Sequence, residues 1–269
     1  MPGTVLGGRR FDWGSRVYVM GIVNVTPDSF SGDGLAADPA GAVARGLAMV
    51  AAGADILDVG GESTRPGHQP VPVEEEISRV LPVVEELARR SGVPVSIDTT
   101  KPDVAAAALR AGAMIVNDIW GLQRSPELAD LAAAAGAAVV VMHNRTDTDY
   151  ADLEAEVLDF LRRSTGIAAA AGIPPERVIV DPGIGFGKTA EQNLEILRAL
   201  GRLRELNRPI LVGTSRKSFL GRIFNQPLEG RLMGTAASVV ASVLRGADIV
   251  RVHDVPEMVR AVRVAEALR

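Results

Sequence analysis

Short apolar runs alternate with longer segments of helical character along most of the chain. Eight runs rich in Val, Ile and Leu end at a polar residue or a glycine, at residues 18–23, 55–59, 95–97, 113–116, 138–142, 178–180, 210–213 and 249–252. Continuous runs of this kind are typical of parallel strands whose two faces are both buried. The pattern therefore predicts the α/β class, as a (β/α)8 barrel with a helix after each strand.

The residues that follow these runs are types that bind ligands or take part in chemistry. A (β/α)8 barrel gathers the carboxyl ends of all its strands on one face, where its active site lies. We therefore expect the active site among the residues at these ends, which are Asn24, Gly60, Gly61, Glu62, Asp98, Asn117, Asp118, His143, Asp181, Thr214, Ser215, Arg216 and His253.

Some of the segments between the runs carry signals of helix ends. Thr189 with Gln192 has the spacing of a capping box, and Asp254 with Glu257 repeats that spacing before the last helical stripe. Pro82 lies within the predicted helix 74–90 and should kink or break it, because proline lacks the N–H that the helix needs.

The length of the chain agrees with one barrel. It has 269 residues, of which 47% are hydrophobic, and single (β/α)8 domains have about 250 residues. The longest turn-rich stretches, 26–39 and 62–72, follow the first two runs, where active-site loops are expected rather than linkers. We predict a single domain over residues 1–269, with residues 1–17 as an N-terminal extension before the first barrel strand.

Composition narrows the classes of partner. The absence of cysteine excludes disulfides and thiolate metal sites and agrees with a cytoplasmic location. The sequence shows neither a secretory signal at residues 1–12 nor an apolar run of about 18 residues, so we expect no membrane partner. A net charge of -4 with dispersed arginines argues against a nucleic-acid partner.

Lysine is rare in this arginine-rich chain. Of 29 basic residues only Lys101, Lys188 and Lys217 are lysines, and each follows shortly after a predicted strand end. A lysine has a compact ammonium on a flexible stem, whereas arginine has a planar fork. The three positions are therefore candidates for site residues, with chance in an arginine-biased composition as the alternative.

Seven motifs in order, from residue 20 to the C-terminal region, closely resemble those of the dihydropteroate synthases, a family of pterin-binding enzymes. Several long motifs in sequence are strong support, whereas one glycine-rich loop alone would be weak. The motifs are MGIVNVTPDSF (20–30), DVGGESTRPG (58–67), SIDTTKP (96–102), ND (117–118), DPGIGFGK (181–188), GTSRKS (213–218) and RVHD (251–254).

The resemblance implies an enzyme of the folate pathway. It would join 6-hydroxymethyl-7,8-dihydropterin pyrophosphate to p-aminobenzoate and release pyrophosphate. The family's route is dissociative, so that charge must be stabilised on the leaving group and little base catalysis is needed. The catalytic residues that the resemblance implies are Lys217, Arg251, His253 and Asp98.

The pterin site is expected at three strand ends. Asp98, Asn117 and Asp181 are the residue types that read an edge of adjacent hydrogen-bond donors and acceptors. The resemblance assigns them to the pterin, with Lys217 and Arg251 beside its ring. Alternatively, the two aspartates are helix caps or internal ion pairs, and Asn117 is a turn residue.

The pyrophosphate site is expected at the end of the last run. Arg251 and His253 alternate along a strand, so that both side chains point to one side. The resemblance assigns them, Thr64 and Asn24 to the pyrophosphate. It also makes Asn24 the ligand of a Mg2+ cofactor, an ion that needs few protein oxygens. A buried structural role is the alternative for His253. His143 receives no role and could lie behind the site or bind a ligand.

The p-aminobenzoate site needs an apolar slot and an anion site at its end. The resemblance implies a slot formed by Phe30, Pro66 and Phe186, with Thr64 beside it. Ser218 would hold the carboxylate at a helix start, where backbone N–H groups favour an anion. For Phe186, a place in the hydrophobic core is the alternative.

Residues 232–244 carry no charge and are apolar or small on every side. A helix that covers a barrel should keep one polar face, so we expect burial on two sides and a homodimer through this helix, as the family forms.

Two other functions remain open. A pterin-binding methyltransferase would keep Asp98, Asn117 and Asp181 but would have no reason for the motifs 215–218 and 251–253. A pterin-binding protein without turnover would not need the complete set of Asn24, Lys217, Arg251 and His253.

Overall fold

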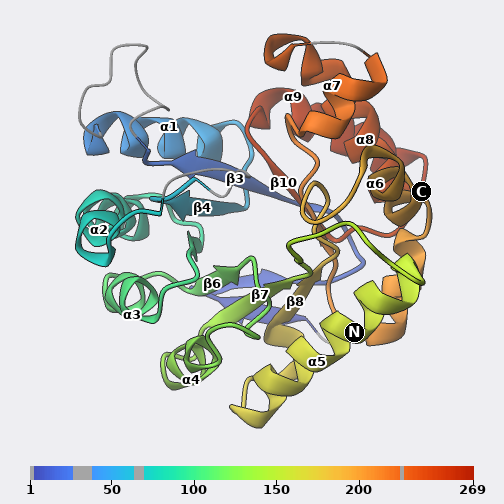
Figure 1. Cartoon of the computed structure of the whole chain (residues 1–269). Coiled ribbons are helices and arrows are strands. Elements are labelled where there is room, and N and C mark those ends of the chain that lie inside the picture. The colour runs from blue at the N-terminus through green and yellow to red at the C-terminus, as the bar shows by residue number, and fades with distance from the viewer. Residues whose placement is uncertain (1–2, 27–37, 64–69, 225–226) are drawn as a thin grey trace.

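The computed structural model describes residues 3–26, 38–63, 70–224 and 227–269. Eight parallel strands form one sheet, in the order β8-β7-β6-β5-β4-β3-β10-β9. An isolated parallel bridge between Val180 and Ile210 joins the two outer strands, and Val180 N donates to Pro209 O at 2.9 Å. The sheet is thereby closed into a barrel, and helices surround it in Figure 1.

The strands fall where the eight apolar runs predicted them. The last but one is the shortest, because only two residues of the run 210–213 pair as a strand. The strands are β3 (Tyr18–Asn24), β4 (Ile56–Gly60), β5 (Val95–Asp98), β6 (Ile115–Asp118), β7 (Ala138–Met142), β8 (Val178–Asp181), β9 (Leu211–Val212) and β10 (Ile249–Val252).

A helix follows each of these strands in the described chain. The helices are α1 (Pro39–Ala51), α2 (Val73–Arg90), α3 (Pro102–Arg110), α4 (Glu127–Ala134), α5 (Leu153–Ala170), α6 (Ala190–Arg198), α7 (Ser218–Phe224), α8 (Leu232–Leu244) and α9 (Val255–Ala267), with 3-10 turns η2 (Pro175–Arg177), η3 (Leu200–Leu206) and η4 (Leu228–Arg231). The predicted (β/α)8 barrel is confirmed, with both α7 and α8 between β9 and β10.

Alternate residues of the strands enter two separate hydrophobic clusters. On β8, for example, Val178 and Val180 belong to the cluster between sheet and helices, whereas Ile179 belongs to the smaller cluster inside the barrel. Successive side chains of a strand point to opposite faces, so every second residue faces the barrel axis. This alternation aims Asp181, two residues after Ile179, into the barrel mouth.

The N-terminal residues close the opposite end of the barrel. Strands β1 (Thr4–Leu6) and β2 (Arg9–Phe11) form an antiparallel pair. Phe11 and Trp13 join the cluster inside the barrel and contact the ring of Tyr18, the first residue of β3, at centroid distances of 4.8 Å (tilted) and 5.4 Å (edge-on). The segment predicted as an extension thus packs against the floor of the barrel.

The helix-end predictions had different outcomes. The capping box of Thr189 and Gln192 is confirmed. The one at Asp254 is wrong, because Asp254 makes no side-chain cap bond and its carboxylate instead accepts from Arg216 Nε at 3.0 Å. Pro82 does not break α2, which continues through it. Among the described helices, none has the length and apolar character needed to span a membrane.

Candidate active site

The sheet register brings the predicted polar residues into one row at the barrel mouth. Asn24 of β3 pairs with Gly60, Gly60 with Asp98, and Asp98 with Asn117, so three neighbouring strand pairs connect them. Asp181 ends β8 beside Met142. Because alternate residues face inward, the carboxylates of Asp98 and Asp181 and the amide of Asn117 converge on the same opening.

Arg251 enters this row from β10 and bridges two buried carboxylates. Its Nε donates to Asp58 Oδ2 and its Nη2 donates to Asp98 Oδ2, both at 2.6 Å. Asp58 is fully buried on β4, and its Oδ2 also accepts from Asn117 Nδ2 at 3.1 Å. Within the described chain, the Oδ1 atoms of Asp58 and Asp98 have no hydrogen-bond partner. Such buried acceptors are costly unless a ligand or water satisfies them.

Asp58 is the site residue that the sequence reasoning missed. It lies in the middle of the apolar run 55–59, not at its end, so the rule that site residues follow the runs does not select it. The available signal was the charge itself, because a carboxylate inside a buried strand needs a specific partner. Here the partner is Arg251, 193 positions away in the sequence.

Asp58 also determines how Asn117 faces the opening. A carboxylate only accepts hydrogen bonds, so the Asn117 side chain must turn its NH2 group towards Asp58. Its Oδ1 is then directed away from Asp58. Asn117 therefore offers an acceptor to the opening.

Burial changes the acidity of both carboxylates at the mouth. Desolvation raises the pKa of Asp98 to about 7, since it outweighs the attraction of Arg251 and since the charge of Asp58 opposes ionisation. Desolvation likewise raises the pKa of Asp181 to about 6, against the hydrogen bond from Gly183 N and the nearby charges of Lys217 and Arg251. Perturbed acids in a concave site are a common mark of function.

Phe186 and Lys217 form a second group beside Asp181. Lys217 Nζ lies 3.9 Å from the centre of the Phe186 ring, a cation–π contact. Phe186 is half-buried and lies outside both hydrophobic clusters, which argues against a core role. Gly185 makes the approach possible, because a Cβ there would meet Lys217 Cδ at 2.9 Å.

His253 follows β10 and is held by Ser215. The Ser215 hydroxyl accepts from His253 N at 3.1 Å and lies 3.0 Å from His253 Nδ1. Donation from this hydroxyl to Nδ1 places the ring proton on Nε2. Burial and the charge of Arg251 lower the pKa of His253 to about 3, so the ligand-free ring is a neutral donor at pH 7.

The other two lysines hold loops. Lys101 pairs with Glu62 and Glu76 and donates to Val71 O at 2.6 Å, so it joins both ends of the loop after β4. Lys188 is buried against His143, at 2.8 Å between Nζ and Nδ1. His143, which had no predicted role, is thus a neighbour of the loop after β8.

The remaining predicted residues are only partly described. Asn24 is half-buried at the end of β3, and Ser218 is the exposed first residue of α7. Phe30, Thr64 and Pro66 lie outside the described residues. Among the residues that are described, no group of three or more His, Cys, Asp or Glu side chains could hold a metal ion.

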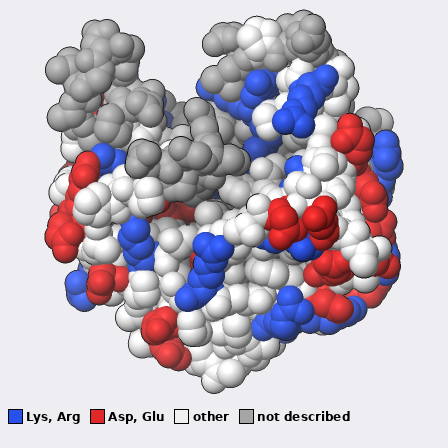
Figure 2. Space-filling view, viewed as in Figure 1, with Lys and Arg blue, Asp and Glu red and all other residues white. Residues whose placement is uncertain are grey.

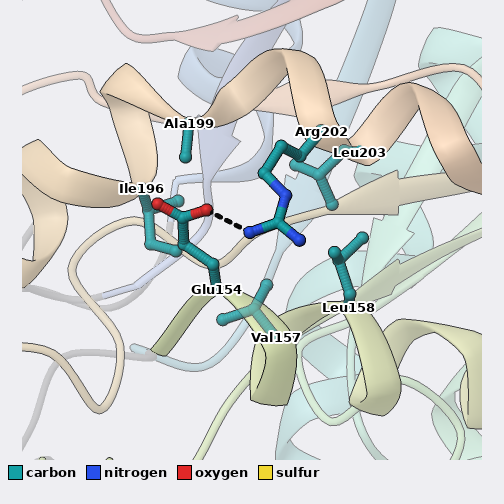
Figure 3. A pocket seen from close by; sticks show the side chains of 7 residues that line it. All are labelled: Glu154, Val157, Leu158, Ile196, Ala199, Arg202 and Leu203. Carbon is teal, nitrogen blue, oxygen red and sulfur yellow. Dashed lines mark hydrogen bonds and ion pairs between the residues drawn. The ribbon is translucent and has the colours of Figure 1, made fainter. Parts of the chain in front are cut away.

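The surface agrees with a site at this end. Figure 2 shows basic side chains gathered at the surface near α7. A separate small pocket lies between α5 and the α6–η3 segment (Figure 3), lined by Glu154, Val157, Leu158, Ile196, Ala199, Arg202 and Leu203. The ion pair of Glu154 with Arg202 spans it, and none of the mouth residues contributes to it. We interpret it as a packing gap.

A barrel whose mouth combines buried carboxylates, an oriented amide and several cations defines an enzyme for a flat, polar, charged substrate. The pterin binding enzyme family matches residues 20–253. The chain is 48% identical over 264 residues to a dihydropteroate synthase of Clostridium beijerinckii, which covers 98% of each chain. The chain belongs to the pterin-binding enzyme family, and within it to the dihydropteroate synthases, which are transferases.

Solved structures agree with this placement. Xanthomonas albilineans dihydropteroate synthase with 4-aminobenzoic acid has 45% identity and a TM-score of 0.94, and the match covers 99% of this chain and 98% of that one. The same enzyme in complex with 7,8-dihydropteroate has 42% identity and a TM-score of 0.91, with the same coverage. The predicted resemblance and the fold are therefore confirmed.

Proposed function

We propose that this chain joins 6-hydroxymethyl-7,8-dihydropterin pyrophosphate to p-aminobenzoate at the barrel mouth and that the mouth residues carry the roles predicted for them. The observation that supports the assignment most directly is the row of Asp98 and Asn117 on adjacent strands, with Arg251 bonded to Asp98. This arrangement unites the predicted pterin and pyrophosphate residues in one opening.

The pterin is bound through its hydrogen-bonding edge. Asp98 and Asp181, when ionised, accept from its N–H groups, and Asn117 presents its Oδ1 as a further acceptor. The unpaired Oδ1 of Asp98 is a ready acceptor for such a donor. Lys217 and Arg251 flank the ring, where their charges favour the ionised form of both aspartates.

The reaction begins with departure of pyrophosphate. The bond between the pterin methylene carbon and the ester oxygen breaks, and the electron pair leaves with pyrophosphate. Arg251 and the Nε2–H of His253, with Thr64, stabilise the developing charge. Asn24 has the oxygen donor that Mg2+ accepts alongside water and phosphate oxygens, and the bound ion would supply charge neutralisation at the leaving group.

The p-aminobenzoate amine then bonds to the methylene carbon and releases a proton. The amine is neutral at pH 7 and needs no activation by a strong base. Phe186 and Lys217, in contact at 3.9 Å, form one wall of its slot. The family resemblance adds Phe30, Pro66 and Thr64, which lie outside the described residues. Ser218 holds the carboxylate.

The proposal is tested by incubating the protein with the pterin pyrophosphate, p-aminobenzoate and Mg2+ and measuring dihydropteroate and pyrophosphate. Asp98→Asn should lower kcat/KM for the pterin substrate at least about 100-fold, because a buried acceptor becomes partly a donor. Asp103→Asn, an exposed change at the start of α3, is the matched control. Pterin binding without product in the wild type would instead indicate a binding protein.

We further propose a homodimer through α8. One side of α8 packs beside α9 (Figure 1), while Leu232, Met233 and Leu244 expose 36%, 77% and 45% of their surface. Sedimentation velocity should show a dimer that Met233→Glu weakens, whereas Val5→Glu, at an equally apolar exposed site on β1, should leave it intact. A wild-type monomer at micromolar concentration would exclude the dimer.

A further inference from the structure

Lys188 is a buried lysine that bonds two carbonyls of the loop after β8 and the ring of His143, which follows β7. Its Nζ lies 2.8 Å from His143 Nδ1 and donates to Gly183 O at 3.0 Å and to Phe186 O at 3.1 Å. An ammonium has three donors, and these partners match them. None of the three partners is a carboxylate. Lys188 therefore forms no ion pair through these bonds; it fixes two backbone carbonyls and a histidine ring in place.

The loop that Lys188 holds is unusually demanding in conformation. Gly183 has a φ of +69°, and a Cβ on it would lie 1.9 Å from His143 O. The chain after β7 and the loop after β8 are therefore packed backbone to backbone. His143 N also donates to Asp181 O at 2.9 Å, so His143 meets the loop through both its backbone and its ring.

This loop carries one predicted residue of each substrate site, Asp181 for the pterin and Phe186 for p-aminobenzoate. Asp181 stands at its start, with Oδ1 accepting from Gly183 N at 2.7 Å, and Phe186 stands near its end beneath Lys217 Nζ. Lys188 bonds the carbonyl of Gly183 and that of Phe186 with a single ammonium. Movement of either half of the loop would therefore disturb the other.

The charge of Lys188 also bears on Asp181. The groups that face Asp181 are Lys188, Lys217 and Arg251, and all three favour its ionised form. Lys188 itself faces Asp181, Lys217 and Arg145, and burial lowers its pKa to about 7. Loss of the Lys188 charge should make Asp181 harder to ionise.

We propose that Lys188, seated on His143, is a positioning residue for both substrates: it holds the loop that carries the Asp181 carboxylate and the Phe186 ring in the conformation that accepts the pterin and p-aminobenzoate together. This inference rests on the proposed function for its two substrates, but it assigns a role to Lys188 and His143 that does not require contact with either substrate.

The experiment compares Lys188→Met, which removes charge and hydrogen bonds, with Lys188→Gln, which removes the charge and keeps two donors. Arg177→Met is the matched control. Arg177 lies directly before β8, at the end of that strand opposite to the loop, and its Nη1 also donates to a backbone carbonyl, Gly136 O, at 2.6 Å. Each variant is measured at 10 °C, with its fold checked by circular dichroism. The readouts are KM for both substrates, kcat/KM across pH 5–9, and binding of 6-hydroxymethylpterin by fluorescence titration.

We expect Lys188→Met to lower kcat/KM for the pterin substrate by about 10- to 100-fold and to raise KM for p-aminobenzoate, as loss of hydrogen bonds from a charged group predicts. The acid limb of kcat/KM should move to higher pH in both lysine variants. The KM of Lys188→Gln for p-aminobenzoate should lie between that of Lys188→Met and that of the wild type. A merely structural lysine would change the melting temperature and leave the acid limb in place.

Three outcomes would overturn the inference: folded variants with kinetics within twofold of wild type, a change confined to thermal stability, or a change in only one of the two substrates. If Lys188→Met does not fold, Lys188→Gln decides by the same criteria. If the wild type binds 6-hydroxymethylpterin but makes no dihydropteroate, the proposed reaction fails, and the pterin titration of the variants still decides whether Lys188 positions the loop.

Discussion

Replacement of Asp181 by asparagine should stabilise the folded protein while it destroys function. Asp181 is buried, and its pKa is raised to about 6 mainly by desolvation. Its Oδ1 accepts from Gly183 N at 2.7 Å, and an asparagine oxygen can accept the same bond. Asp181→Asn therefore removes a buried charge and preserves the loop contact.

The magnitude follows from linkage. The carboxyl group has its ordinary pKa of 3.8 in the unfolded chain and about 6 in the folded one. A raised folded pKa means that its favourable contribution is complete below pH 3.8 and is lost as pH rises through 6. At pH 8 the ionised group thus costs the folded state up to about 3 kcal/mol, and Asp181→Asn should recover at most this amount. At pH 5 the gain should be about half as large.

Urea denaturation at pH 8 and pH 5 measures the difference in the free energy of unfolding. Asp55→Asn is the contrasting control, because Asp55 is a buried aspartate at the opposite end of the barrel, bonded to Arg16 Nη2 at 2.6 Å and to Val19 N at 3.0 Å. Its replacement should destabilise the protein. Pterin binding by Asp181→Asn should be lost at both pH values, because the amide offers a donor where the pterin also offers donors.

The reasoning is refuted if Asp181→Asn is less stable than wild type at pH 8, or if its gain does not shrink as pH falls. Either result would mean that the neighbouring cations stabilise the Asp181 carboxylate more than burial penalises it. A stabilised, inactive variant would show that the site holds a charge for binding at the expense of stability, a common compromise in active sites.

Three further perturbations test other parts of the structure. Trp13→Ala should lower the free energy of unfolding by about 3–5 kcal/mol and leave kcat/KM unchanged at 10 °C, which tests whether residues 1–17 belong to a single domain with the barrel. Asp58→Asn should lower the free energy of unfolding, measured in urea, by about 2 kcal/mol, because Arg251 then has Asp98 as its one carboxylate hydrogen-bond partner. It should also move the acid limb of kcat/KM to lower pH, because the charge of Asp58 raises the pKa of Asp98. Gly183→Ala should abolish pterin binding in fluorescence titration, because its methyl group would meet His143 O; normal binding would exclude the tight loop packing.

The barrel could be predicted because each strand is a local signal. Runs such as 138–142 are apolar on both faces. A strand of this kind is typical of a parallel sheet that is covered on both sides. The same signal weakens at β9, where only Leu211 and Val212 pair as a strand, since neighbouring residues already turn into the loop. The false capping box at Asp254 shows the limit of local patterns, because Arg216, far away in sequence, competes for the carboxylate.

The site could be predicted only as far as residue types at strand ends allow. Their position at strand ends placed Asp98, Asn117 and Asp181 in the barrel mouth, and the sheet register agrees with that placement. Nothing local indicates that Phe186 lies under Lys217 rather than in the core, because the contact depends on how the loop after β8 folds. The positive φ of Gly183 and the bonds of Lys188 determine that conformation together.

The pairing of Arg251 with Asp58 shows why the missed residue could not be found from its own strand. In the closed barrel β10 lies beside β3, and β3 lies beside β4. Only β3 therefore separates β10, the last strand of the chain, from β4. An arginine side chain is long enough to cross that intervening strand, and it reaches both Asp58 on β4 and Asp98 on β5. Closure of the barrel, which is a property of the whole chain, thus brings Arg251 to two buried carboxylates, where its charge opposes the rise that burial causes in the pKa of Asp98.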